Sequence, residues 1–265
     1  PSPPPPPHPR AHKANAQVMG QTCSGGGSPY APMNQNVPNQ MTMGNDPFQG
    51  ATELLIQQEW AAVECCSLEA KQRYRISQPV GPEKAEGEPF LYITEESGCL
   101  ERICCSTNRS LTLKLHDGPT KEAPVIQRMH KPFSLQGCCF CRPSFTVTGA
   151  GGEGDLVGTV EDPCRCCTMD QQVYGKDKNL LFTTAGSICQ FGMCCPCCAP
   201  IHFDVKQGGS DVASIEKMTL SCAEMCTKTN RFLVNFDKIT DPEAKRMLLA
   251  SAMLLDLGYF EQNKN

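Results

Sequence analysis

The sequence predicts a mainly β protein, and three observations support this fold class. Short segments that alternate apolar and polar residues recur at roughly ten-residue spacing, which is typical of antiparallel sandwiches and barrels. One helix that is apolar nearly all round follows them. The first fifty residues are rich in Pro, Gly and Asn and cannot form a core. We therefore expect a closed antiparallel β-barrel around a hydrophobic C-terminal helix, preceded by a disordered Pro-rich tail.

The tail is assigned to residues 1–50 and a single barrel domain to residues 51–265. Pro3–Pro7 form a polyproline run, the kind of segment that SH3 and WW domains bind in polyproline II geometry. His8 stands where such motifs need a proline, so a solvated tail without a partner is the plainer interpretation.

The strands are predicted from alternation of period two. Leu111, Leu113 and Leu115 alternate with polar residues and show the pattern most clearly. Residues 54–63 suit either a short helix or a strand. Further strands are expected at 73–76, 90–93, 145–147, 156–160, 180–182 and 201–205, with turns at 149–154, 176–179 and 208–209.

The C-terminal helix is predicted over residues 241–260. Asp241 fits the N-cap, Pro242 the first helical position and Glu243 the first turn. A helix that is apolar all round is either buried or in a membrane. Its apolar stretch of about 14 residues would span about 21 Å, short of a hydrocarbon core of about 30 Å. Asp256 adds a cost in lipid, so the barrel interior is favoured over a span. The expected helix positions in the core or membrane are Met247, Leu248, Leu249, Met253, Leu254, Leu255, Leu257 and Phe260.

Charge and motifs limit the function classes. The net charge of -4 and the pI of about 5.8 give no basic surface for nucleic acid. The five histidines form no catalytic pattern, and no nucleophile, phosphate or dinucleotide motif is present. The sequence therefore predicts a protein that is not an enzyme.

Cysteine usage is unusual, with 19 residues and many adjacent pairs. Adjacent cysteines seldom both reach distant partners, so we interpret most as reduced and the protein as facing the cytosol. A secreted disulfide framework is the alternative.

A series of short motifs occurs in a specific order between Thr52 and Glu261. They are Leu54–Gln58, Lys71–Ile76, Glu95–Cys99, Cys104-Cys105, Ser110–Leu113, Cys138–Cys141, Leu156–Gly158, Asp162–Cys164, Met253–Leu257 and Phe260-Glu261. In their order and spacing the chain resembles the phospholipid scramblase family. The resemblance implies a tubby-like barrel, Ca²⁺-activated and ATP-independent movement of phospholipids between bilayer leaflets, and S-palmitoylation. It also implies association with the cytosolic face of the plasma membrane or an internal membrane. The family's basic nuclear-import stretch is not matched, since residues 214–219 contain one basic residue.

Two groups of cysteines are candidates for lipidation: Cys138, Cys139 and Cys141, where the family is palmitoylated, and Cys194, Cys195, Cys197 and Cys198. More than one acyl chain is needed for firm anchoring, which favours clustered cysteines. Structural zinc is a less favoured alternative, with C-x₂-C pairs at Cys138/Cys141, Cys164/Cys167 and Cys194/Cys197.

The segment before the last helix corresponds to the family's calcium-binding region. Ca²⁺ needs oxygen ligands at alternate positions, and Asn230, Asn235, Asp237 and Asp241 are the candidates. The positive charges of Lys228, Arg231 and Lys238 would repel the cation, so we expect weak calcium binding at most. For Asp241 we prefer the role of helix N-cap to that of calcium ligand.

The expected function is passive movement of phospholipids. A helix inside a barrel cannot also span the bilayer, so translocation would need an oligomer or a helix that leaves the barrel. One alternative is a palmitoylated, membrane-tethered interaction module without transport activity. Another is a zinc-stabilised cytosolic β-protein.

Overall fold

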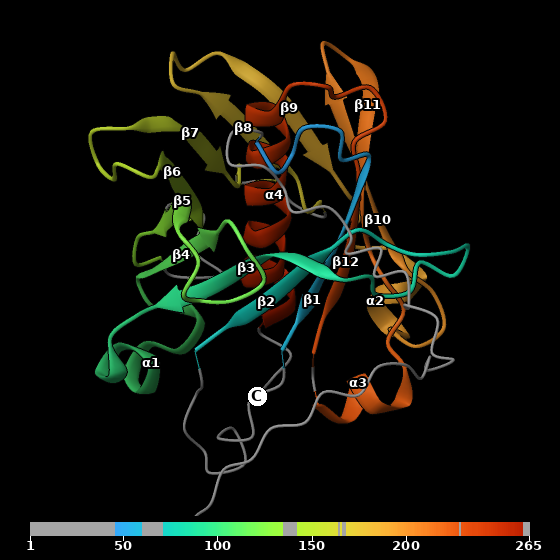
Figure 1. The fold of residues 1–265 in the computed structure, drawn as a ribbon. Coiled ribbons are helices and arrows are strands. Elements are labelled where there is room, and N and C mark those ends of the chain that lie inside the picture. The colour runs from blue at the N-terminus through green and yellow to red at the C-terminus, as the bar shows by residue number, and fades with distance from the viewer. Residues whose placement is uncertain are drawn as a thin grey trace, which may run out of the picture. The chain divides into compact units, whose positions relative to one another are not determined.

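The computed structural model describes residues 46–59, 71–134, 142–163, 165, 168–227 and 229–261. Within these residues, twelve antiparallel strands form a closed barrel, as expected (Figure 1). The strands are β1 (Glu53–Gln58), β2 (Arg73–Ser77), β3 (Pro89–Glu96), β4 (Leu111–His116), β5 (Val125–Lys131), β6 (Ser144–Gly149), β7 (Leu156–Glu161), β8 (Gln171–Gly175), β9 (Leu180–Ala185), β10 (Ile201–Gln207), β11 (Ser210–Lys217) and β12 (Arg231–Asn235).

The strand order follows the chain, so each strand pairs with its sequence neighbours. Short connections suffice for such a meander because consecutive strands are antiparallel. Closure comes from the first and last strands: Leu54 of β1 lies opposite Val234 of β12. A closed barrel has no unpaired strand edge.

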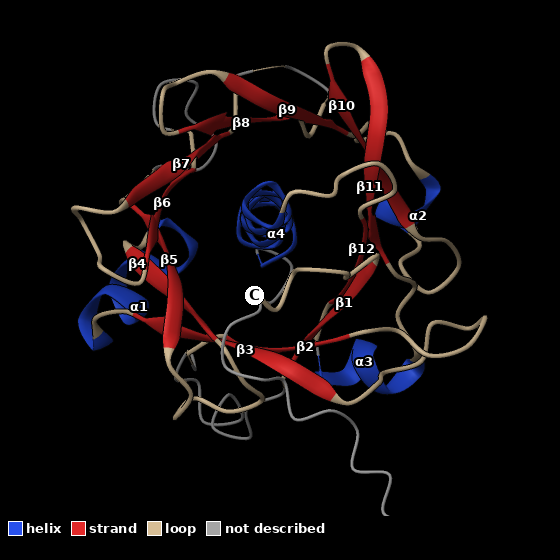
Figure 2. Ribbon diagram, turned by 45° about the horizontal axis from the view of Figure 1, so that its top comes forward, coloured by secondary structure: helices blue, strands red, loops and turns tan. Residues whose placement is uncertain are grey.

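Helix α4 (Pro242–Leu255) lies inside the ring of strands, as Figure 2 shows. It continues into the π-helical turn η3 (Asp256–Phe260). Asp241 is its N-cap, because the carboxylate accepts a hydrogen bond from the amide N–H of Ala244 at 2.9 Å. The predicted helix start is therefore confirmed. All the apolar helix positions named from the sequence are buried, from Met247 to Phe260.

The inward strand residues and the helix form one core. Leu111, Leu113 and Leu115 of β4 are buried at alternate positions, as the alternation predicted. Gly158 lies where the helix approaches the wall. A side chain there would meet Met247 at 2.8 Å and collide with the carbonyl of Tyr174, so only glycine fits.

Short helices lie outside the ring of strands: α1 (Cys99–Cys105) with η2 (Ser106–Asn108), α2 (Phe191–Cys194) and α3 (Cys222–Thr227) (Figure 2). No helix among the described residues is both long and apolar enough to cross a membrane.

The structure differs from the sequence-based expectation in its first strand and in four further strands. Residues 53–58, left open between helix and strand, form β1. Strands β5, β8, β11 and β12 were not predicted. The segment of β12 was interpreted as part of a calcium-binding loop because it corresponds to that region of the scramblase family, yet its alternate residues Phe232 and Val234 are buried. Cross-strand pairing and burial override composition here.

The polyproline run lies outside the described residues. Phe48, which the sequence analysis placed in the tail, is fully buried in the barrel core.

Candidate functional site

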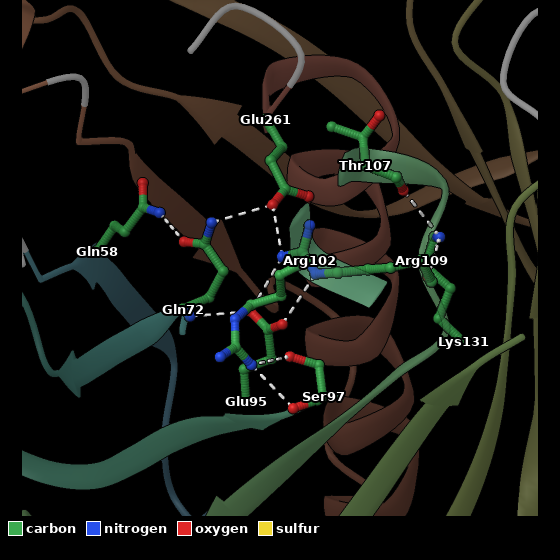
Figure 3. A network of polar contacts seen from close by, with 9 residues as sticks. All are labelled: Gln58, Gln72, Glu95, Ser97, Arg102, Thr107, Arg109, Lys131 and Glu261. Carbon is green, nitrogen blue, oxygen red and sulfur yellow. Dashed lines mark hydrogen bonds and ion pairs between the residues drawn. The ribbon is translucent and has the colours of Figure 1, made fainter. Parts of the chain in front are cut away.

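A buried polar cluster closes the barrel end where the C-terminal helix terminates (Figure 3). Its centre is Arg109, which follows η2 and is fully buried. The guanidinium donates from Nε to Glu95 Oε1 at 3.0 Å and from Nη2 to Glu95 Oε2 at 3.1 Å. Nη2 also donates to Glu261 Oε1 at 2.8 Å. One arginine thus joins the end of strand β3 to the residue that follows η3.

Two glutamines and a lysine extend this cluster. Gln72 donates from its side chain to Glu261 Oε1 at 3.0 Å and from its backbone N–H to Glu95 Oε2 at 2.8 Å. Gln58 donates to the side-chain oxygen of Gln72. Lys131 Nζ donates to the carbonyls of Thr107 and Arg109 at 3.1 and 3.0 Å. We call Gln58, Gln72, Glu95, Arg109, Lys131 and Glu261 the polar end cluster.

The charges of the polar end cluster balance, with two cations and two carboxylates. Burial alone would raise the pKa of Glu95, but the hydrogen bond and charge of Arg109 bring that pKa below its usual value. Burial would lower the pKa of Arg109, and the carboxylates of Glu261 and Glu95 raise it above the usual value instead. The pKa of Lys131 is lowered to about 8, chiefly by burial; the Glu261 carboxylate opposes this shift and the neighbouring Arg109 cation adds to it.

A second set of contacts holds the last turn of the helix. The buried carboxylate of Asp256 accepts from Tyr74 Oη at 2.6 Å and from Asn230 Nδ2 at 2.7 Å. Lys217 Nζ lies 5.0 Å from the centroid of the Phe260 ring. From the sequence, Asp256 was expected to make insertion of the helix into lipid unfavourable. In the structure its carboxylate links the helix to β2 and to the residue before β12.

The helix is also attached at its middle and at its start. Ser251 Oγ lies 3.0 Å from Thr184 Oγ1 of β9. At the N-terminal end, Lys245 Nζ donates to the carbonyls of Ala51 and Phe48 at 2.6 and 3.1 Å. Polar contacts therefore hold α4 at its end, middle and start, to the strands and to the segment before β1, inside an otherwise apolar core.

The predicted calcium ligands are not brought together. Asn230 lies at the polar end and is bound to Asp256. Asn235 is the last residue of β12, about 16 Å from Asn230 at the usual strand rise, and Asp237 and Asp241 follow that end of the strand. Asn235 Oδ1 accepts from the Asp237 backbone N–H at 2.8 Å, and Asp241 caps α4. The four residues cannot share one ion, because an intervening strand separates them.

The candidate lipidation residues fall into two parts. Cys138, Cys139 and Cys141 lie outside the described residues, as do Cys164 and Cys167 of the zinc alternative. Cys194, Cys195, Cys197 and Cys198 lie in the connection from β9 to β10. Cys195 and Cys198 form a disulfide across a turn, with Cα atoms 5.4 Å apart. For these two residues the interpretation as reduced thiols is wrong in this structure, because the turn brings them together.

Cys194 and Cys197 are exposed free thiols. Among the described residues, Cys195, Cys197 and Cys198 are the group of potential metal ligands whose ligand atoms all lie within 4.8 Å of one another.

Sequence reasoning missed most of the polar end cluster. Arg109 and Lys131 belong to no motif, and Glu95 was recognised only as the first residue of the Glu95–Cys99 motif. Glu261 and Asp256 were recognised only as parts of the terminal motif and helix. The sequence signal for this end of the barrel was Asp256, a charged residue at the end of an apolar helix.

Comparison with known proteins gives a consistent result. The sequence model of the family described as Scramblase matches residues 30–262. Phospholipid scramblase 1 of Mus musculus is 24% identical to 91% of this chain, and the match covers 70% of that protein. Phospholipid scramblase 2 of Bos taurus is 24% identical over 80% of the chain and 69% of its own length. Phospholipid scramblase 4 of Homo sapiens is 25% identical over 88% and 72%. No solved structure matches at a significant level.

Proposed function

The chain belongs to the scramblase family, and from this premise we propose that it moves phospholipids between the leaflets of a membrane without covalent chemistry. The observation that carries the proposal is the extent of the family match, which includes every strand of the barrel and the enclosed helix. The relatives are named phospholipid scramblases over the same region. Association with a membrane follows from this function, and the cytosolic face is part of the proposal.

We propose further that α4 stays inside the barrel during lipid movement. Leaving would break the contacts of Glu261, Asp256 and Lys245 and expose side chains that are fully buried. Removing one partner of a buried charge pair costs about 3–5 kcal/mol. Lipid headgroups would then pass along the outside of the barrel, or between barrels of an oligomer.

The test is transbilayer movement of a fluorescent phospholipid in liposomes that carry the purified full chain. We expect movement above that in protein-free vesicles. The rate is expected to be the same with Ca²⁺ and with a chelator, because Asn230 lies apart from the other three candidate ligands. Absence of movement with folded, membrane-bound protein would contradict the proposal. Stimulation by Ca²⁺ would contradict only its calcium-independent part.

A tethered interaction module is the second candidate. It is favoured by one observation: residues 185–201 contain no charged side chain, and there Ile188 and Phe191 are 41% and 67% exposed beside the free thiols of Cys189 and Cys194. An exposed apolar segment with thiols suits a membrane surface and acylation. The polyproline run would then recruit SH3 or WW domains, which stays a prediction.

The two lipidation groups can be separated by variants. Cys138, Cys139 and Cys141 are changed to Ser in one protein, and Cys194, Cys195, Cys197 and Cys198, together with the neighbouring Cys189, in another. Hydroxylamine-sensitive acyl labelling and membrane fractionation are measured for both. Loss of labelling and of membrane binding in one variant identifies the anchor. If both variants keep them, neither group is the anchor.

A further inference from the structure

We propose that the turn Cys195–Cys198 is a redox-gated binding site for a soft thiophilic cation, Zn²⁺ or Cu⁺. The reduced thiolates of Cys195, Cys197 and Cys198 would be its ligands. This site shares Cys197 with the Cys194/Cys197 pair expected from the sequence, but its other two ligands are Cys195 and Cys198. It does not depend on lipid movement by the protein.

The turn is exposed but held by rigid neighbours. The amide N–H of Cys195 donates to the carbonyl of Phe191 at 2.9 Å, and that of Cys198 to the carbonyl of Cys195 at 3.0 Å. The amide N–H of Leu220 donates to the carbonyl of Pro196 at 2.9 Å, which ties the turn to the segment after β11. Ligand positions are thus set largely before any ion binds.

The segment before the turn is fastened to β10. Gln190 accepts from the backbone N–H of His202 at 2.8 Å and donates to its carbonyl at 2.8 Å. Gly192 packs so closely that a Cβ would lie 2.7 Å from the carbonyl oxygen of Pro200. Only glycine permits this approach, which presses α2 against the strand that follows the cysteines.

The sulfur spacing fits one ion. Cys197 Sγ lies 3.6 Å from Cys195 Sγ and 3.6 Å from Cys198 Sγ. Zinc–thiolate bonds of about 2.3 Å in a tetrahedron place sulfurs about 3.8 Å apart. Small rotations of the three side chains, once the disulfide opens, would therefore bring all three sulfurs into contact with one ion.

The ligand type selects the cation. The group consists of sulfur alone, and no carboxylate or histidine occurs between residues 185 and 201. Thiolates prefer Zn²⁺ and Cu⁺ to Ca²⁺ or Mg²⁺. The same stretch has no Lys or Arg that would repel the ion. A three-coordinate shell suits Cu⁺, whereas Zn²⁺ would take a fourth ligand, water or Cys194.

The disulfide makes the site redox-gated. A phosphine reductant in water supplies two electrons and becomes its oxide; the Cys195–Cys198 sulfur–sulfur bond breaks and two thiols form. Three thiols then release three protons as three sulfur–metal bonds form. Hydrogen peroxide, which takes up the two electrons and two protons and becomes two waters, re-forms the Cys195–Cys198 disulfide; only Cys197 is then left as a thiolate, and the ion is expelled. Acylation of Cys197 would likewise exclude the ion.

The test uses the full chain, reduced without air by a phosphine, and cobalt(II) as a spectroscopic probe. Because 19 cysteines are present, the measured quantity is a difference between variants. We expect the triple variant Cys195→Ser/Cys197→Ser/Cys198→Ser to lose one equivalent of thiolate-to-cobalt absorption per chain. The control Cys99→Ser/Cys104→Ser/Cys226→Ser, three exposed free thiols elsewhere, should keep the wild-type value.

Two further measurements identify the ion and the gate. Zn²⁺ is added to the cobalt-loaded protein, and in a separate experiment Cu⁺ is titrated in the presence of a competing chelator. The preferred ion is the one that occupies the single equivalent per chain that the triple variant lacks. Oxidation before titration should abolish that equivalent in the wild-type chain. Circular dichroism confirms folding, and Cys197→Ser alone replaces the triple variant if that one unfolds. The proposal would be overturned if the triple variant and the control bound the same amount of cobalt. It would also be overturned if Zn²⁺ did not displace this cobalt and Cu⁺ did not bind in its place.

Discussion

Arg109 and Glu261 lie 152 residues apart in the sequence, and their side chains form a buried ion pair of 2.8 Å at the end of the barrel. The guanidinium is fully buried and the carboxylate is 4% exposed. Glu95 shares the same guanidinium. The last residue that the structure describes is thereby attached to the wall that surrounds the helix.

The first prediction concerns this pair. Arg109→Met should lower the free energy of unfolding by about 3–5 kcal/mol, because two buried carboxylates lose their counter-charge. Denaturant unfolding measures the change. The matched control is Lys114→Met, which removes the surface pair with Glu96 and should cost at most about 1 kcal/mol. Similar losses in both variants would show that the Arg109 cluster contributes no more than a surface pair.

The second prediction concerns Asp256. Tyr74→Phe removes the hydroxyl that donates to Asp256 at 2.6 Å and leaves the bond from Asn230. We expect a loss of about 1.5–3 kcal/mol in the free energy of unfolding, the usual range for a hydrogen bond to a charged group. Tyr174→Phe, whose hydroxyl bonds to Gln172 at the surface side, is the control and should lose less. If Tyr74→Phe left the free energy of unfolding unchanged, the hydrogen bond from Tyr74 to Asp256 would not contribute to stability.

The third prediction is a pH dependence. Burial lowers the pKa of Lys131 from its usual 10.5 to about 8 in the folded protein. Between pH 8 and 10.5 the unfolded chain binds more protons at this residue, so stability should rise with pH in that window. The gain is on the order of 1–3 kcal/mol. Unfolding at several pH values is compared with Lys131→Met, since other groups titrate there too. Parallel curves for the two proteins would contradict the lowered pKa.

The fourth prediction tests whether the helix stays inside. Thr184 Oγ1 and Ser251 Oγ lie 3.0 Å apart, so Thr184→Cys/Ser251→Cys should form a disulfide between β9 and α4 on mild oxidation. Lipid movement should persist in the cross-linked protein, because the helix is not expected to leave the barrel. Oxidised wild type and the two single variants control for the native cysteines. Activity that is lost on oxidation and restored by a reductant would show that the helix must move.

The local elements followed from the sequence because their signals lie within a few residues. Alternation in Leu111–Leu115 predicted a half-buried strand, and Asp241-Pro242-Glu243 predicted the helix start. The apolar surface of the helix, combined with many short strands, favoured a barrel around it. Strand β12 was missed because its position in the chain matched the family's calcium-binding region, and its pairing with β1 cannot be read from the local sequence.

The candidate sites depended on contacts that no local pattern encodes. Asn230 was grouped with Asp241 by position in the chain, yet β12 carries the two to opposite ends of the barrel. Cys194 to Cys198 were recognised as a cluster, but only the turn decides which sulfurs meet.

The sequence by itself determined the family, the period of each clear strand, and a helix too apolar to lie on a surface. The tertiary structure decided that Arg109 neutralises Glu261, that Tyr74 holds Asp256, and that β1 closes on β12. The physical reason is range. Propensity and periodicity act between neighbours, whereas a buried charge or an unpaired strand edge is satisfied only when closure brings distant residues together.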